Sequence, residues 1–270
     1  MKPFRTRFAK DIVCEFLPPK KPSNKVIIIS SGVPSVPKLS DTINFYSNKG
    51  FWVFHPRYRG TWESDGSFLK KSLDLDIQDV INQLPKGFIC LENNKKYFIK
   101  LGKLYLFGCS FGGPAAILNS KDKRVLKVVT LSPVIDWSSE SKDEPLDKSF
   151  KYAKLAYGNA YRIDTKKWNE LKLGKFYNPI NNVDKVSGKK IMIFHAKDDR
   201  SVNWKPAVEF CKKTGSELVL LNRASAGIEP TSCRSTICHS TILSYEARFS
   251  VGYSFVICKG GSFCFYPPKE

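Results

Sequence analysis

Residues 103–113, KLYLFGCSFGG, join an apolar run directly to a cluster of glycines. They predict a buried strand that turns sharply into a helix, with Ser110 at the turn. A serine in a strained backbone conformation at such a corner leaves no room for side chains at Gly108 and Gly112. The turn would lift the Ser110 hydroxyl above the sheet and point the N-terminus of the helix at the place where an oxyanion forms. The pattern therefore indicates a nucleophile elbow.

Apolar, β-branched runs recur along the chain between segments with helical spacing. Continuous rather than alternating apolarity is typical of strands covered on both faces, as in a parallel sheet. Residues 73–84 predict an amphipathic helix, with Asp74, Asp76 and Asp79 mostly on its polar side. The order of elements predicts a doubly wound α/β fold with a mostly parallel sheet. The predicted strands are residues 12–17, 26–30, 51–55, 104–107, 125–131, 191–194 and 218–221.

The segment 136–189 is more polar than the rest and lacks a clear strand. Its helix-like pieces, 150–157 and 168–171, suggest a small helical cap inserted after the strand that ends near Ser132. The aromatic residues of this cap either line an acyl or aryl pocket or pack the cap onto the body. We expect one α/β domain over residues 1–270, with the cap at 136–189 inside it and an atypical tail at 222–270.

The formal net charge of +19 raises the question of nucleic-acid binding. The lysines are spread singly or in pairs without an arginine-rich helix, which favours a solvated surface over a nucleic-acid site. No apolar run approaches the roughly 20 residues that span a bilayer. The basic start is followed by Asp11 and a short apolar strand rather than by a secretory signal, so we expect a cytoplasmic protein.

Eight cysteines without a signal peptide suggest reduced thiols rather than a disulfide scaffold. Half of them are predicted to be small core residues, and the rest crowd the tail around His239. The spacings in the tail match no known zinc module, so we expect no metal site. The first group is Cys14, Cys90, Cys109 and Cys211, and the second is Cys233, Cys238, Cys258 and Cys264.

Several short motifs in one order give the chain its resemblance to the α/β-hydrolase superfamily. They are SGVP at 31–34, HPRYRGTWESDG at 55–66, GCSFGG at 108–113, LSPVIDW at 131–137 and FHAKDDRSV at 194–202. The chain looks most like the serine esterases of the superfamily and the catalytic domains of prolyl-oligopeptidase-type peptidases. The resemblance covers roughly residues 10 to 221 and implies the α/β-hydrolase fold.

The resemblance implies an oxyanion hole made of two backbone amides, those of Val33 and of Phe111, the residue after the nucleophile. Relatives usually carry His-Gly in the first loop, where this chain has Ser31 and Gly32. The departure leaves a backbone donor in place. An ordinary Gly/Pro loop is the alternative interpretation.

The same resemblance assigns the triad acid to the loop after a strand and selects Asp199, with Asp198 as the alternative. The acid would orient an imidazole and stabilise its charged form rather than accept its proton. His195 would then be a turn residue. Arg57 and Arg59 are expected to anchor their loop through hydrogen bonds.

The base is the point of departure from the family. Relatives order their triad Ser, Asp, His, with the histidine shortly after the strand that here is 216–221. His239 is the only later histidine, and it comes about ten residues beyond that place, whereas His55 comes too early. The tail also loses lysines, and residues 249–268 predict a hairpin where relatives finish with a helix. A lineage-specific replacement and a cloning or reading-frame scar are both open explanations.

The resemblance implies a serine hydrolase that cleaves carboxylic esters through an acyl-enzyme on Ser110. Asp199, His239 and the amides of Phe111 and Val33 would complete the machinery, without a metal or organic cofactor. The expected partner is a small ester or peptide substrate, and the oligomeric state is left open. We rank esterase above peptidase because no long N-terminal gating domain precedes the motifs. Peptides, lactones and a catalytically silent, ligand-binding version of the fold are the alternatives.

Overall fold

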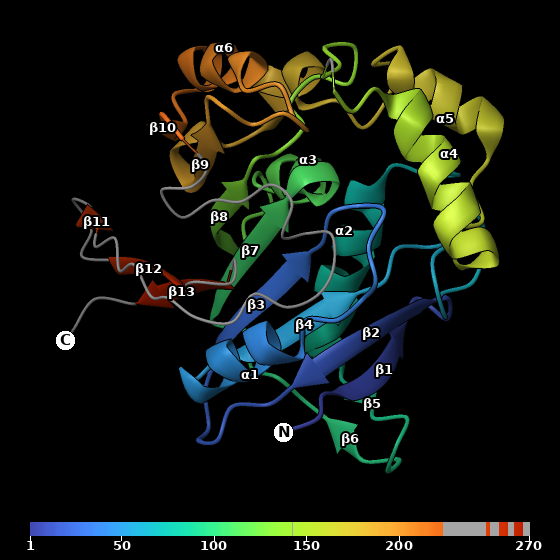
Figure 1. Cartoon of the computed structure of the whole chain (residues 1–270). Coiled ribbons are helices and arrows are strands. Elements are labelled where there is room, and N and C mark those ends of the chain that lie inside the picture. Colours follow the sequence, from blue (N-terminus) through green and yellow to red (C-terminus); the bar gives the residue numbers. More distant parts are fainter. Residues whose placement is uncertain (142, 224–246, 249–253, 259–261, 267–270) are drawn as a thin grey trace.

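The computed structural model describes residues 1–141, 143–223, 247–248, 254–258 and 262–266. A central eight-stranded sheet organises the chain (Figure 1). Only the edge pairings, β1 with β2 and β2 with β4, are antiparallel, and the remaining pairings are parallel. The strand order is β1 (Phe4–Phe8), β2 (Ile12–Leu17), β4 (Trp52–Pro56), β3 (Lys25–Ser30), β7 (Lys103–Cys109), β8 (Val125–Leu131), β9 (Ile191–Ala196) and β10 (Glu217–Leu221). The predicted α/β fold with a mostly parallel sheet is confirmed.

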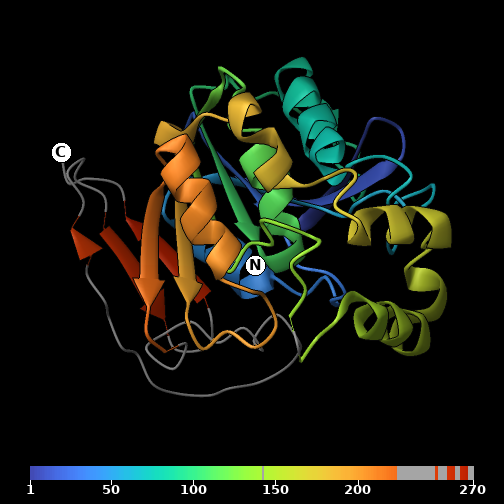
Figure 2. The same ribbon diagram turned by 90° about the horizontal axis from the view of Figure 1, so that it is seen from above.

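Helices connect the parallel strands, as a doubly wound sheet requires. Figure 2 shows α6 lying along β9 and β10. The helices are α1 (Ser40–Asn48), α2 (Leu73–Gln83), α3 (Gly113–Leu118), α4 (Leu146–Tyr157), α5 (Thr165–Lys172) and α6 (Lys205–Thr214), with short helices η1 (Leu84–Lys86), η2 (Ser110–Gly112), η3 (Gly158–Ala160), η4 (Pro179–Lys185) and η5 (Gly188–Lys190). A small two-stranded sheet pairs β5 (Phe88–Ile89) with β6 (Lys96–Tyr97).

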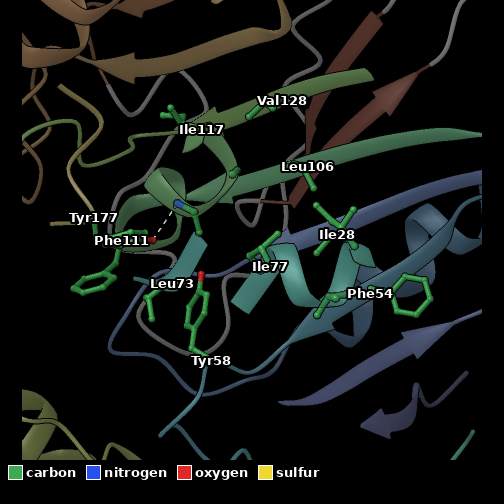
Figure 3. Close-up of a cluster of buried hydrophobic side chains, with 14 of the residues drawn as sticks. Ile28, Phe54, Tyr58, Leu73, Ile77, Leu106, Phe111, Ile117, Val128 and Tyr177 are labelled. Carbon is green, nitrogen blue, oxygen red and sulfur yellow. Dashed lines mark hydrogen bonds between the residues drawn. The ribbon is translucent and has the colours of Figure 1, made fainter. Parts of the chain in front are cut away.

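Alternate residues of the central strands enter two separate hydrophobic clusters, one on each face of the sheet. Ile27 and Ile29 join the cluster that contains Ile43 and Tyr46 of α1. Ile28 joins the cluster that contains the apolar sides of α2, α3 and α6. Figure 3 shows part of this second cluster, where the side chains of α2 face those of β3 and β7. Because both faces are covered, the strands read as continuous apolar runs.

The antiparallel edge and one carboxylate differ from the sequence prediction. The strand β1 was not predicted, because its sequence FRTRF has apolar side chains only at its two ends and no continuous apolar run.

The position of Asp76 also differs from the prediction. Asp76 was expected on the polar side of its helix, but only 1% of its surface is exposed. Its carboxylate pairs with the guanidinium of Arg59, which also binds Asp11 and Asp79. The predicted anchoring of the loop by Arg59 is therefore confirmed.

The segment 136–189 contains α4 and α5, which lie side by side and apart from the β9–β10 end of the sheet (Figures 1 and 2). The backbone after α4 is hydrogen-bonded to the loop that follows β4. The amide of Trp62 donates to the carbonyl of Ala160 at 2.7 Å, and the amide of Phe68 donates to that of Arg162 at 2.9 Å. These bonds tie the predicted cap to the body. That it is a separate inserted unit stays a prediction.

In the tail, β12 (Ser254–Cys258) pairs antiparallel with β13 (Ser262–Tyr266) and with β11 (Ala247–Arg248). The hairpin predicted from the sequence is therefore present in the backbone. No helix among the described residues is both long and apolar enough to cross a membrane.

Candidate active site

Ser110 lies at the junction of β7 and the short helix η2, with a φ of +48°. A left-handed conformation is costly for a serine and needs support from its surroundings. The two flanking glycines supply the space. A Cβ on Gly108 would lie 2.8 Å from the carbonyl oxygen of Gly112, and one on Gly112 would lie 2.3 Å from that of Ser30. The side chain of Ser110 is half-buried at the carboxyl end of the strand.

Phe111, the first residue after the serine, is buried under aromatic residues of the segment 136–189. Its ring centroid lies 4.5 Å from that of Trp137 and 6.0 Å from those of Trp168 and Tyr177. The hydroxyl of Tyr177 donates to the carbonyl of Phe111 at 2.7 Å and accepts from the amide of Ala115 at 3.0 Å, a bond drawn in Figure 3. These three rings pack the cap onto the body, as one of the two sequence interpretations expected.

The amide of Phe111 is the first of the two predicted oxyanion donors. It stands in the first turn of η2, where N–H groups have no partner within the helix. The helix α3 continues directly from η2.

The loop with the second predicted donor packs directly against this turn. A Cβ on Gly112 would lie 2.4 Å from the carbonyl oxygen of Ser31. The amide of Gly32 donates to the sulfur of Cys109 at 3.2 Å, and the hydroxyl of Ser35 donates to the carbonyl of Gly32 at 2.7 Å. The structure thus brings the backbone around Val33 next to the elbow.

Asp199 lies in the loop after β9, where backbone amides hold its carboxylate. Its Oδ1 accepts hydrogen bonds from the amides of Ser201 and Val202, both at 2.9 Å. Its Oδ2 is buried and faces Nε2 of His195. The alternative acid, Asp198, is exposed.

His195 is part of β9 and fully buried, so the prediction that it is a turn residue is wrong. All residues of β9 are buried, because this strand is covered on both faces of the sheet. Its Nε2 lies 3.2 Å from the carbonyl oxygen of Val202 and 3.4 Å from Oδ2 of Asp199. A carbonyl only accepts, so Nε2 carries the proton. Burial opposes ionisation of Asp199, but its interactions with His195, the Val202 amide and Ser132 outweigh it and lower the pKa of the carboxyl.

Two residues of the loop after β8 were not assigned a role from the sequence. Ser132 has a φ of +42°, and its amide donates to the carbonyl of Phe194 at 2.8 Å. The amide of Val134 donates to the carbonyl of Ser110 at 3.2 Å. The loop therefore joins the elbow to the strand that precedes Asp199. The motif LSPVIDW could have indicated this loop. Its Pro133 packs so closely on Gly113 that a Cβ added to Gly113 would lie 2.3 Å from the Cβ of Pro133.

The remaining predicted residue, His239, lies outside the described residues. Across the described part of the chain, no cluster of three or more histidine, cysteine or acidic side chains could hold a metal ion. Cys14, Cys90 and Cys211 are buried as predicted, whereas Cys109, also expected in the core, is half-buried next to Ser110.

Comparison with known proteins places this arrangement in a family. The sequence profile of the prolyl oligopeptidase family matches residues 37–224. The match includes Ser110 and Asp199 and ends before His239. No curated protein matches the chain in sequence.

Solved structures of α/β-hydrolases share the fold at low sequence identity. The Pyrococcus furiosus esterase Pf2001 is 20% identical with a TM-score of 0.59, over 82% of each chain. The Pyrococcus horikoshii acylaminoacyl peptidase is 15% identical with a TM-score of 0.57, over 82% of this chain and 37% of that one. Est1E from Butyrivibrio proteoclasticus with bound ferulic acid is 17% identical with a TM-score of 0.54, over 80% of this chain and 88% of that one.

Proposed function

This chain belongs to the prolyl oligopeptidase family of α/β-hydrolases, and we propose that it hydrolyses carboxylic esters with Ser110 as the nucleophile. The observation that carries the proposal is the left-handed backbone of Ser110, held between two glycines at the end of β7. A strained backbone conformation persists only where the surrounding structure holds it in place, and such positions cluster at active sites. Serine hydrolases use this turn to present the hydroxyl above the sheet.

The charge that develops on the carbonyl oxygen of the substrate would be stabilised by the amides of Phe111 and Val33. Support comes from the place of Phe111 in the first turn of η2, where N–H groups have no partner within the helix, and from the packing of the loop at Ser31 on Gly112. Preorganised backbone donors of this kind cost no reorganisation during the reaction.

Asp199 is the proposed acid. Two backbone amides fix Oδ1, which leaves the buried Oδ2 as an acceptor for the N–H of a catalytic imidazole. An ionised carboxylate oxygen can accept more than one hydrogen bond, so Oδ2 can accept an imidazole N–H beside its long contact with Nε2 of His195. The lowered pKa of Asp199 keeps the acceptor charged at neutral pH.

His239 is the proposed base, on the grounds of chain order within the family. It would take the proton of Ser110 during attack and return it to the leaving alkoxide, after which water releases the acyl group. The competing function is ligand binding without turnover. This alternative arises because the chain has no histidine at the family position after β10.

Esters are preferred over peptides because the esterase Pf2001 and Est1E match this chain over more than four-fifths of their own length. The acylaminoacyl peptidase contains a large further part that this chain does not match. The ferulic acid bound to Est1E makes hydroxycinnamate esters part of the substrate class to be tested.

The test compares turnover of p-nitrophenyl esters of increasing chain length, methyl ferulate and peptide anilides. We expect kcat/KM for at least one ester to exceed that for every anilide and to be lost in Ser110→Ala. Loss of turnover in His239→Ala supports that residue as the base, and unchanged turnover removes it. A folded protein that turns over no substrate of either class contradicts the proposed function.

A further inference from the structure

A second serine in this structure, Ser31, contacts a histidine, which in turn contacts a carboxylate. Ser31 follows β3, His55 belongs to β4 and Glu15 to β2. The hydroxyl oxygen of Ser31 lies 2.8 Å from Nε2 of His55, and Nδ1 of His55 lies 3.3 Å from Oε2 of Glu15. Glu15 and His55 face each other in the antiparallel pairing of β2 with β4. The three side chains therefore line up in the order nucleophile, base and acid.

The charges around His55 fix the direction of the hydrogen bonds. An ionised carboxylate only accepts, so Nδ1 carries the proton and Nε2 is left to accept the proton of the Ser31 hydroxyl. Glu15 stays ionised, because its bonds to His55 and Arg57 outweigh the effect of burial and lower its pKa. Arg57 contacts the other carboxylate oxygen of Glu15 at 3.1 Å.

His55 is only 2% exposed, and this burial lowers its pKa against the opposing effect of Glu15. The imidazole is therefore neutral at neutral pH and able to accept a proton. Any positive charge that it gains lies next to the carboxylate of Glu15.

Ser31 is half-buried, and its backbone packs on the same turn that presents Ser110. The hydroxyl of Tyr58 donates to the carbonyl of Ser31 at 3.1 Å and fixes the residue from the other side. The two serines therefore lie on backbone segments that contact each other.

We propose that Ser31 is a second nucleophile, activated by His55 and Glu15, that reacts with small activated esters and organophosphorus reagents. In this step the Ser31 oxygen forms a bond to the acyl carbon or phosphorus, and the bond to the leaving group breaks. The proton passes from Ser31 to Nε2 of His55 and then to the leaving alkoxide or fluoride. The reaction is slower than that at Ser110, because the neighbouring amide of Gly32 is already bonded to the sulfur of Cys109.

The experiment labels the folded full-length Ser110→Ala chain with a fluorophosphonate and maps the modified peptides by mass spectrometry. We expect the label on Ser31 and none on Ser35. Ser35 is a matched internal control, because it is half-buried in the same loop but its hydroxyl donates to the carbonyl of Gly32. In the Ser110→Ala background, His55→Gln, whose amide keeps an acceptor but not a base, should slow labelling of Ser31 by about 100-fold.

An unlabelled Ser31 in the folded Ser110→Ala chain overturns the proposal, as does equal labelling of Ser31 and Ser35. Labelling of Ser31 that His55→Gln leaves unchanged also overturns it. The comparison of Ser31 with Ser35 needs no change at His55, so it decides the matter even if that variant does not fold. Labelling of Ser110 in the unsubstituted chain tests the proposed function separately.

Discussion

The amide of Val134 donates a hydrogen bond to the carbonyl oxygen of Ser110 at 3.2 Å. In the same loop, the amide of Ser132 donates to the carbonyl of Phe194, in the strand that leads to Asp199. One short segment thus holds the turn of the proposed nucleophile and the strand of the proposed acid. Two backbone hydrogen bonds of this loop therefore connect the proposed nucleophile and the proposed acid.

Asp199→Asn should lower kcat/KM for esters by at least about 100-fold without unfolding the chain. The amide keeps an oxygen for the N–H groups of Ser201 and Val202, but it removes the charge that supports an imidazolium. Asp198→Asn is the matched control, since Asp198 is the exposed neighbour, and it should stay within about twofold. Equal losses in both variants would remove Asp199 from the mechanism.

Gly112→Ala should disrupt the elbow, because the added Cβ would lie 2.3 Å and 2.4 Å from the carbonyl oxygens of Ser30 and Ser31. Both obstacles are backbone atoms, so relief requires the oxyanion loop to shift. We expect loss of fluorophosphonate labelling. Gly215→Ala is the control, since its Cβ meets nothing within 4 Å and only the cost of a φ of +69° remains, about 1 kcal/mol. If fluorophosphonate labelled Gly112→Ala as fully as the parent chain, this would contradict the close packing of the loop at Ser31 on the turn at Ser110.

Tyr177→Phe should reduce the free energy of unfolding by about 1–3 kcal/mol, because it leaves the buried amide of Ala115 and the carbonyl of Phe111 without their shared hydroxyl. Urea unfolding measures the change. Tyr152→Phe, at a ring that is 40% exposed on α4, should change it by less than about 0.5 kcal/mol. A Tyr177→Phe chain as stable as the parent would show that the elbow does not depend on this contact.

His55 should make a contribution to thermal stability that falls as the pH drops from 7 to 5, while Asp76, whose pKa burial raises to about 6, contributes in the opposite sense. The pKa of His55 in the folded chain lies below the ordinary 6.5, chiefly through burial, so in this window the unfolded chain binds the extra proton. The stabilisation is complete above about pH 6.5 and is lost as the pH falls toward the folded pKa. Measured against His55→Gln, the parent chain should therefore lose Tm as the pH falls from 7 to 5, and parallel curves for the two chains would contradict the assignment.

The parallel strands and the elbow were predictable from the sequence because their signals are local. A continuous apolar run marks a strand buried on both faces, and the glycines around Ser110 mark a turn without room for side chains. The strand β1 escaped prediction because an edge strand needs no such run.

Long-range partnerships were not predictable in the same way. Asp76 and Asp79 sit on one helix and both pair with Arg59 of the loop after β4, yet only Asp76 is buried. The contact between Ser31 and His55 depends on the order of strands in the sheet, which brings β4 next to β3. No spacing in the sequence encodes that order.

The most direct test of the central claim is to label the folded, unsubstituted chain with a limiting amount of fluorophosphonate and to identify the modified residue. The account predicts that the label is predominantly on Ser110 and that Ser110→Ala removes this fast reaction. A folded chain whose Ser110 carries no label would contradict the assignment of Ser110 as the nucleophile.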